Sequence, residues 1–167
     1  MTKLDLKWLI VLLLFGLSIY VVYLAFFKPL SLNDLTQRKE IPYATMLNQI
    51  NSSKSICIVF DYSNLTDPIR QNVGQCAADI AYSYTSWFNR PIHVFGIENG
   101  VCTTLNQTKS ESDCVREILS KGCFIFLIKG NENVLTRSFN NLMEINVGRS
   151  YKPFDCSIRI NGKISPS

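Results

Sequence analysis

CFIFLIKG, residues 123–130, is the stretch that decides the fold, since every position from Cys123 to Ile128 is apolar. A strand that is apolar on both faces is typical of the middle of a parallel sheet that is covered on both sides. Two further stretches of strand length precede it, SICIVFDY at 55–62 and PIHVFGIE at 91–98. We therefore predict three parallel strands, with residues 123–130 in the middle of the sheet.

Helical patterns separate these three strands. After Asp67-Pro68, an N-cap residue followed by proline, apolar residues recur at steps of three and four as far as Phe88. A shorter pattern begins at Ser110 with a start like a capping box and ends at Gly122. Helical connections of this length join parallel neighbours through right-handed crossovers. The order strand, helix, strand, helix, strand predicts a βαβαβ core.

The segments on either side of this core complete the predicted domain. Residues 43–50 place apolar side chains on one face of a short helix, which we expect to pack on the sheet. Downstream, two stretches of strand character flank Asn140-Asn141 and predict a hairpin, and the alternating residues 156–160 predict a last short strand. We predict a small three-layer α/β sandwich over residues 43–167, whose C-terminal part extends the sheet with antiparallel strands.

Residues 8–27, WLIVLLLFGLSIYVVYLAFF, form an apolar run of 20 residues without a charge, bracketed by Lys7 and Lys28. At 1.5 Å per residue a helix of this length spans about 30 Å, the hydrocarbon thickness of a bilayer. A cleaved signal peptide is the alternative, but its apolar region is usually ~7–15 residues long and a small-residue cleavage site follows it. A buried soluble helix would normally show a polar face. We predict a transmembrane helix, with membrane lipid as its partner.

The cysteines indicate on which side of the membrane the domain lies. Counting Lys and Arg on either side of the apolar run gives nearly a tie. All six cysteines follow the run, and an even number is typical of a disulfide-bonded domain outside the cytoplasm. Six reduced, buried cysteines are the alternative. We predict a cytoplasmic tail (1–7), a polar juxtamembrane stalk (28–42) and an extracytoplasmic domain (43–167). Three N-x-Ser/Thr triplets, at Asn51, Asn64 and Asn106, also follow the run but arise readily by chance.

One disulfide can be predicted from spacing. Cys102 and Cys114 enclose a polar stretch with little apolar surface to hold it, so a bond between them would stabilise that stretch. Cys76 lies on the apolar face of its helix, either as a buried thiol or tied to the sheet. The alternative for Cys114 is a reactive thiol in the first turn of a helix, although no C-x-x-C motif accompanies it. Metal binding is not predicted, because no ligand pair has the spacing of a zinc site.

Polar side chains gather where the three parallel strands end. Ligands of open α/β sheets bind at the carboxyl ends of such strands. The structural alternative is that every strand must end in polar turn residues, whatever the protein does. The ligand-binding candidates at these ends are Asp61, Ser63, Asn64, Glu98, Lys129 and Asn131.

Motifs of known chemistry do not occur in the sequence. There is no G-x-S-x-G, P-loop or G-x-G-x-x-G, and the single histidine, His93, lies inside a predicted strand. We therefore predict no catalytic residues, no metal and no cofactor. A hydrophobic content of 47% with 11% aromatic residues excludes a disordered chain, and a net charge of +4 is too small to indicate nucleic-acid binding.

Two functions fit these features. The first is a membrane-anchored extracytoplasmic domain with a binding, scaffold or assembly role, whose partner is a protein of the membrane or envelope. The second is a membrane-anchored enzyme, hydrolase-like or thiol-based, that uses Asp61 or Cys114 at the ends of the parallel strands. A deep cleft at the strand ends would favour the enzyme.

Overall fold

The computed structural model describes residues 6–37, 39–131 and 135–158. The chain divides into two compact units, Met1–Leu30 and Ser31–Ser167, which are taken separately here.

The first unit contains the helix α1 (Leu6–Phe27). From Lys7 to Phe27 it is long and apolar enough to cross a membrane, and its side chains from Lys7 onward are exposed in the isolated chain. The hydroxyl of its serine is satisfied within the helix, because Ser18 Oγ donates to the Leu14 carbonyl (2.5 Å). The helix is thus consistent with a membrane anchor or a signal sequence.

The second unit is built on a seven-stranded mixed sheet in the order β4-β3-β2-β1-β5-β7-β6, and the prediction of a mixed α/β fold is confirmed. The strands are β1 (Ile56–Asp61), β2 (Ile92–Glu98), β3 (Val101–Thr103), β4 (Thr108–Ser110), β5 (Phe124–Gly130), β6 (Leu135–Phe139) and β7 (Leu142–Val147).

The parallel part of the sheet is larger than predicted. β1 pairs in parallel with β2 and β5, as expected, but β7 also pairs in parallel with β5. The prediction that the C-terminal strands form an antiparallel extension is therefore wrong for β7 and holds only for β6. The reason is that β6 takes the outer position and turns back at Asn141, whose φ is 59°, so that β7 returns between β6 and β5. The short strand predicted at 156–160 is absent over the described residues 156–158, and the rest of it lies outside them.

The opposite edge of the sheet is formed by two short strands, β3 and β4, that were not predicted. β3 pairs antiparallel with β2, and β4 with β3. Asn99 and Gly100 form the first turn with φ values of 49° and 81°. An Asn-Gly pair in this conformation matches the twist of the strands that it joins, and this signal was missed.

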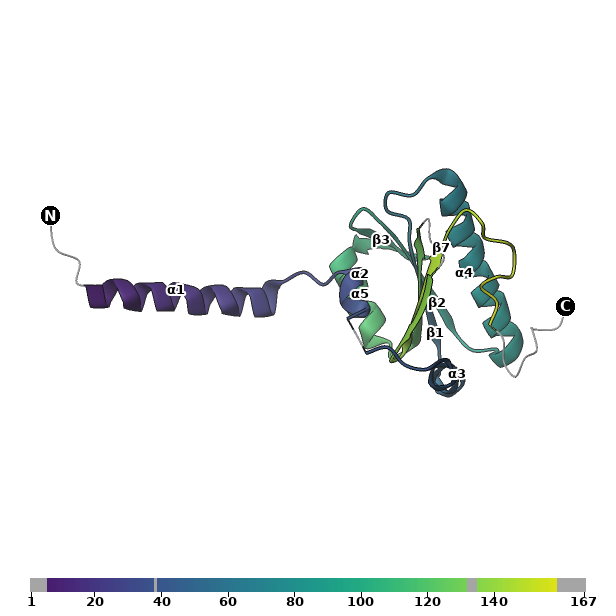
Figure 1. Cartoon of the computed structure of the whole chain (residues 1–167), viewed down its shortest axis with the longest axis horizontal. Helices are drawn as coiled ribbons and strands as arrows, with labels where there is room; N and C mark the ends of the chain where they lie inside the picture. Colours follow the sequence, from purple (N-terminus) through teal and green to yellow (C-terminus); the bar gives the residue numbers. More distant parts are fainter. Residues whose placement is uncertain (1–5, 38, 132–134, 159–167) are drawn as a thin grey trace. The chain divides into compact units, whose positions relative to one another are not determined.

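Helices lie against both faces of the sheet (Figure 1). On one face, α3 (Tyr43–Ser52) and α4 (Asp67–Phe88) share an apolar core with the sheet. On the other, α5 (Glu111–Ser120) buries Cys114, Val115 and Ile118, with the short α2 (Leu32–Leu35) beside it. The predicted helices correspond to α3, α4 and α5, and Ser110 is the N-cap of α5, accepting a hydrogen bond from the Asp113 N–H (3.2 Å).

Residues 31–42 differ from the predicted stalk. Leu32 and Leu35, three residues apart on α2, are only 5% and 1% exposed. Ser31 and Asp34 form a capping box that starts the helix, and the Leu32 N–H donates to Glu111 Oε1 (2.8 Å). Part of the segment predicted as a stalk, Ser31 with α2, therefore belongs to the second compact unit, Ser31–Ser167.

Candidate functional site

The candidate residues at the strand ends do lie along one edge of the sheet. Asp61, the last residue of β1, is in register with Ile97 of β2 and Lys129 of β5. The polar side chains that the sequence analysis named therefore follow three neighbouring strands. Their hydrogen bonds show what each of them does.

The turn after β1 uses its polar groups to hold its own shape. Asp61 Oδ1 accepts a hydrogen bond from the Ser63 N–H (2.9 Å), and Ser63 Oγ accepts one from the Asn99 N–H (2.9 Å). Asn64 has a φ of 58°, in the left-handed region that asparagine tolerates. These contacts link the turns after β1 and β2, and they give Asp61 Oδ1 and Ser63 Oγ a structural role in the turns.

Glu98, at the end of β2, is paired with a helix residue. Both of its carboxylate oxygens accept from Arg70, at 2.5 and 2.9 Å, and the guanidinium lies 4.6 Å from the centre of the Tyr62 ring. The hydrogen bonds from Arg70 hold the pKa of Glu98 below its usual range. Glu98 is therefore an anionic partner of Arg70 rather than a proton donor.

The residues at the end of β5 make fewer polar contacts than those at the ends of β1 and β2. Lys129 Nζ donates to Asn33 Oδ1 at 3.5 Å, and the Asn131 N–H donates to the Val147 carbonyl (3.1 Å). Between them, Gly130 lies so close to Leu65 that a Cβ at this position would meet Leu65 Cδ2 at 2.5 Å. An apolar side chain thus fills the space over the end of β5.

A cavity of about 330 Å³ adjoins Glu98 on the face of the sheet that carries α4. Asp61, Asn64, Lys129 and Asn131 are not among its described lining residues. The strand-end residues therefore do not surround one common cleft in the described part of the chain. The residues that line this cavity are Phe60, Tyr62, Arg70, Val94, Gly96, Glu98, Thr103, Thr104 and Leu105.

A second cavity, of about 340 Å³, lies at the other end of the sheet, and we call it the C-terminal cavity. Ser157 is among its lining residues, and the Ser157 hydroxyl is buried without a hydrogen-bond partner among the described residues. The lining mixes apolar and polar side chains, and the volume is within the range of small-molecule sites. Its lining residues are Tyr43, Met46, Ile50, Phe126, Thr136, Met143, Ile145, Asn146, Val147, Ser150, Tyr151, Asp155, Cys156, Ser157 and Ile158.

The wall formed by residues 150–158 is fastened to α4 by a buried carboxylate. Asp79 is 2% exposed, and its Oδ2 accepts hydrogen bonds from the Tyr151 hydroxyl and from the Phe154 N–H (2.5 Å). Burial, followed by the bond to Asp79, raises the pKa of Tyr151 well above its usual range, so this phenol remains a donor. The disulfide Cys76–Cys156 adds a covalent link between the same two segments.

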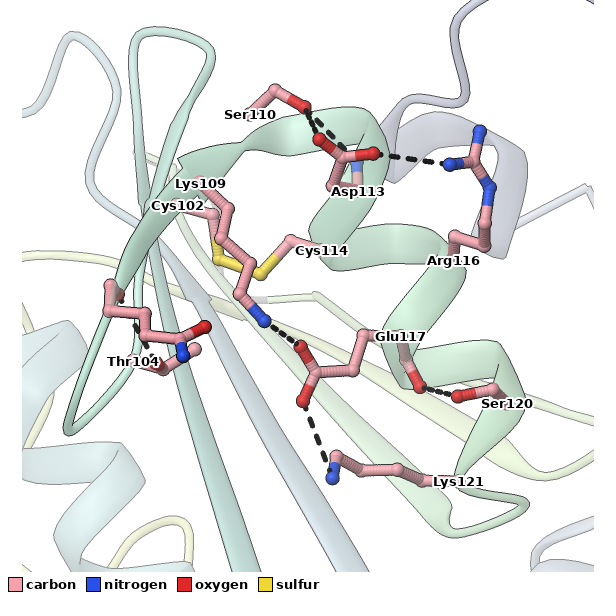
Figure 2. Close-up of polar contacts among 11 residues, drawn as sticks. Cys102, Thr104, Lys109, Ser110, Asp113, Cys114, Arg116, Glu117, Ser120 and Lys121 are labelled. Atoms are coloured by element: carbon pink, nitrogen blue, oxygen red, sulfur yellow. Dashed lines mark hydrogen bonds and ion pairs between the residues drawn. A yellow bond between two sulfur atoms is a disulfide. The ribbon is translucent and has the colours of Figure 1, made fainter.

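All six cysteines are paired, as Cys57–Cys123, Cys76–Cys156 and Cys102–Cys114. The last bond is the one that the sequence analysis named, with its Cα atoms 6.2 Å apart (Figure 2). Cys76 is tied to the C-terminal segment and not to the sheet, contrary to expectation. Because Cys114 is bonded, the alternative of a reactive thiol at this helix start does not fit the structure.

His93 has a structural position in β2. Burial, together with the nearby charge of Lys121, lowers its pKa, so the ring is neutral near pH 7. In the part of the chain that the structure covers, no group of three or more His, Cys, Asp or Glu side chains is placed to hold a metal ion.

Comparisons of the chain with protein-family models, with curated proteins and with solved structures found no match.

Proposed function

We propose that the chain is a single-pass membrane protein that presents a three-layer α/β domain outside the cytoplasm, where the domain has a binding or assembly role. The observation that carries this proposal is the position of the cysteines: all six form disulfides within the unit that follows α1. Disulfides persist in oxidising compartments and are rare in the cytoplasm. The apolar length of α1 supports its role as the anchor.

The enzyme alternative has less support. Its thiol form requires a free Cys114, which is disulfide-bonded. Its hydrolase form requires an Asp61 that can reach a substrate, and this carboxylate accepts a backbone hydrogen bond within its own turn. We therefore favour a non-catalytic role, with a protein of the membrane or envelope as the partner.

The topology gives the first prediction. A protease added to intact cells should digest the domain and leave the short N-terminal tail attached to the membrane, detected by a tag on the tail. Before digestion, the tagged chain should be found in the membrane fraction and, after treatment with glycosidase, should have the polypeptide mass of 19.0 kDa plus the tag. Protection of the domain until the membrane is opened would reverse the orientation, and loss of the tag during maturation would make α1 a signal sequence.

The binding site that we propose is the C-terminal cavity, which would receive an apolar group of the partner. Anilinonaphthalene sulfonate, a dye that fluoresces in apolar sites, should bind a fragment that starts at Ser31. Thr136→Trp should weaken this binding at least about tenfold, or about 1.4 kcal/mol, because exposed Thr136 lines the cavity and the indole would fill it.

The control for this second prediction is Leu135→Trp. Leu135 is also exposed and on β6, but it does not line the cavity. Dye fluorescence and circular dichroism of both variants would be measured together. Equal dye binding by folded Thr136→Trp and Leu135→Trp would show that the cavity is not the apolar site.

A further inference from the structure

The β3–β4 hairpin carries a pattern that the proposed binding site does not use. Asn106-Gln107-Thr108 is an N-x-Thr triplet, the acceptor pattern of N-linked glycans on domains outside the cytoplasm. Two other triplets begin at Asn51 and Asn64. To be modified in the folded domain, a triplet must offer both the asparagine amide and the hydroxyl to the glycan transferase. The three triplets differ in this respect.

Asn106 and Gln107 lie at the tip of the β3–β4 hairpin, and Thr108 is the first residue of β4, in register with Thr103 of β3. The tip is closed by the Thr104 N–H, which donates to the Gln107 carbonyl (2.9 Å). Asn106, Gln107 and Thr108 are all exposed, and the neighbouring Leu105 is 90% exposed. The side chains of the triplet are therefore open to solvent, although Asn106 borders a shallow hollow that His93 of β2 and Glu117 of α5 also line.

The base of the same hairpin is fixed. The Cys102–Cys114 disulfide joins β3 to α5, and Lys109 of β4 forms an ion pair with Glu117 of α5 (2.5 Å), as Figure 2 shows. A firm base and an exposed tip allow the hairpin to carry a bulky group without disturbing the core. The hairpin is also at the edge of the sheet opposite to β6, so a glycan there would leave the C-terminal cavity open.

The Asn51 triplet is held in a helix end. Asn51 and Ser52 belong to the last turn of α3, and the Ser53 hydroxyl donates to the Gln49 carbonyl (2.6 Å). The Ser53 carbonyl also accepts from Arg90. The hydroxyl that the transferase must contact is therefore already bonded.

The Asn64 triplet is held between β1 and α4. Asn64 itself is in the left-handed region, with a φ of 58°. Asn64 and Thr66 are exposed, and Thr66 at the start of α4 makes no capping hydrogen bond with its side chain, but Leu65, the middle residue, packs against the apolar core. Presenting this triplet in an extended form would pull Leu65 from the core.

We propose that Asn106 is the N-glycan acceptor of this protein, an inference that rests on the extracytoplasmic orientation proposed above. The co-reactant is an oligosaccharide carried on a lipid pyrophosphate. Asn106 Nδ2 forms a bond to C1 of the first sugar, the bond between C1 and the pyrophosphate oxygen breaks, and Nδ2 loses a proton to a base. The lipid pyrophosphate leaves, and no oxidation or reduction takes place.

The test is translation of the full chain in the presence of endoplasmic-reticulum microsomes, with mobility measured before and after glycosidase. The wild-type chain should show an increase in apparent mass that corresponds to one glycan and that glycosidase removes. Asn106→Gln and Thr108→Ala should abolish it, whereas Thr108→Ser, which keeps the triplet, should retain it. Asn51→Gln and Asn64→Gln should behave as the wild type. An increment that persists in Thr108→Ala, or that disappears in Asn64→Gln, would overturn the assignment.

A second glycan acceptor distinguishes a wrong membrane orientation from a wrong assignment of Asn106. A tag with one N-x-Thr triplet, fused before Met1 through a spacer, is glycosylated only if the N-terminus enters the lumen. A glycan on the tag and none on the domain would overturn the proposed orientation and the Asn106 site together. A domain that is protected from added protease inside the microsomes, yet lacks a glycan, would overturn the Asn106 site alone.

Discussion

Replacing both Cys76 and Cys156 by alanine should lower the free energy of unfolding of the fragment from Ser31 by about 4–5 kcal/mol on the chain-entropy model. The bond joins residues 80 positions apart, so its loss frees a long loop in the unfolded chain. It also links α4 to the wall of the C-terminal cavity. Since small domains are stable by only about 5–15 kcal/mol, the variant should unfold at a much lower urea concentration.

The matched control is the double alanine variant of Cys102 and Cys114. This bond closes only 12 positions, and the same model gives a loss of about 3 kcal/mol. Both of these cysteines are fully buried, so the packing loss in the control is no smaller. Urea unfolding followed by circular dichroism measures both variants. If the control proves the less stable of the two, loop length does not decide how much each bond contributes.

The two disulfides also show what the sequence can and cannot predict. Cys102 and Cys114 could be paired because a short polar stretch lies between them. Cys57 and Cys76 find partners 66 and 80 positions away, and six cysteines allow about 15 pairings that spacing alone does not rank. Such bonds follow from the tertiary fold, which brings Cys123 beside β1 and Cys156 beside α4.

The sheet was predictable where strands are continuously apolar and less so elsewhere. β1 and β5 are buried over most of their length, and their continuous apolar sequences predict them as strands. β3 and β4 have only three residues each, and their sequences, VCT and TKS, do not stand out from a loop. The direction of β7 depends on where β6 lies in the sheet, and no local sequence pattern predicts the position of β6.

The candidate site was predicted in position but not in detail. The strand ends do align, since parallel register requires it. Which oxygens are free depends on turn geometry, and Asp61 and Ser63 turn out to bond neighbouring backbone. The C-terminal cavity could not be predicted, because α3 and residues 150–158, which line it together, lie about a hundred positions apart in the sequence.

Asp79 is the residue whose role was least visible in the sequence. A carboxylate on a helix is ordinarily a solvent-exposed residue. Here the segment after β7 covers it, and the carboxylate accepts hydrogen bonds from Tyr151, Phe154 and Gln75. Phe154 has a φ of 70°, a conformation that costs free energy for a bulky residue and that the bond from its N–H to Asp79 offsets.

Asp79→Ala should therefore lower the free energy of unfolding by about 3 kcal/mol, because it leaves several partly buried donors without an acceptor. Asp155→Ala is the control from the same segment: Asp155 is exposed and accepts the Lys152 N–H (2.8 Å), so its loss should cost less than about 1 kcal/mol. Equal losses in the two variants would show that Asp79 does not anchor the segment.

The hydrogen bond between Tyr151 and Asp79 should make the free energy of unfolding depend on pH, an effect that a loss of packing alone would not produce. Burial and Asp79 raise the pKa of Tyr151 in the folded state above its ordinary value of 10.0. The stability that this phenol contributes is therefore fully present below pH 10 and is lost as the pH rises through the folded-state pKa. Tyr151→Phe lacks the group, so the difference in unfolding free energy between wild type and Tyr151→Phe should shrink above pH 10. Other tyrosines titrate equally in both proteins and cancel. A difference that stays constant from pH 7 to pH 11 would mean that the Tyr151 hydroxyl does not bond Asp79 in solution, and the wall of the cavity would then be held to α4 by the Phe154 N–H bond to Asp79 and by the Cys76–Cys156 disulfide.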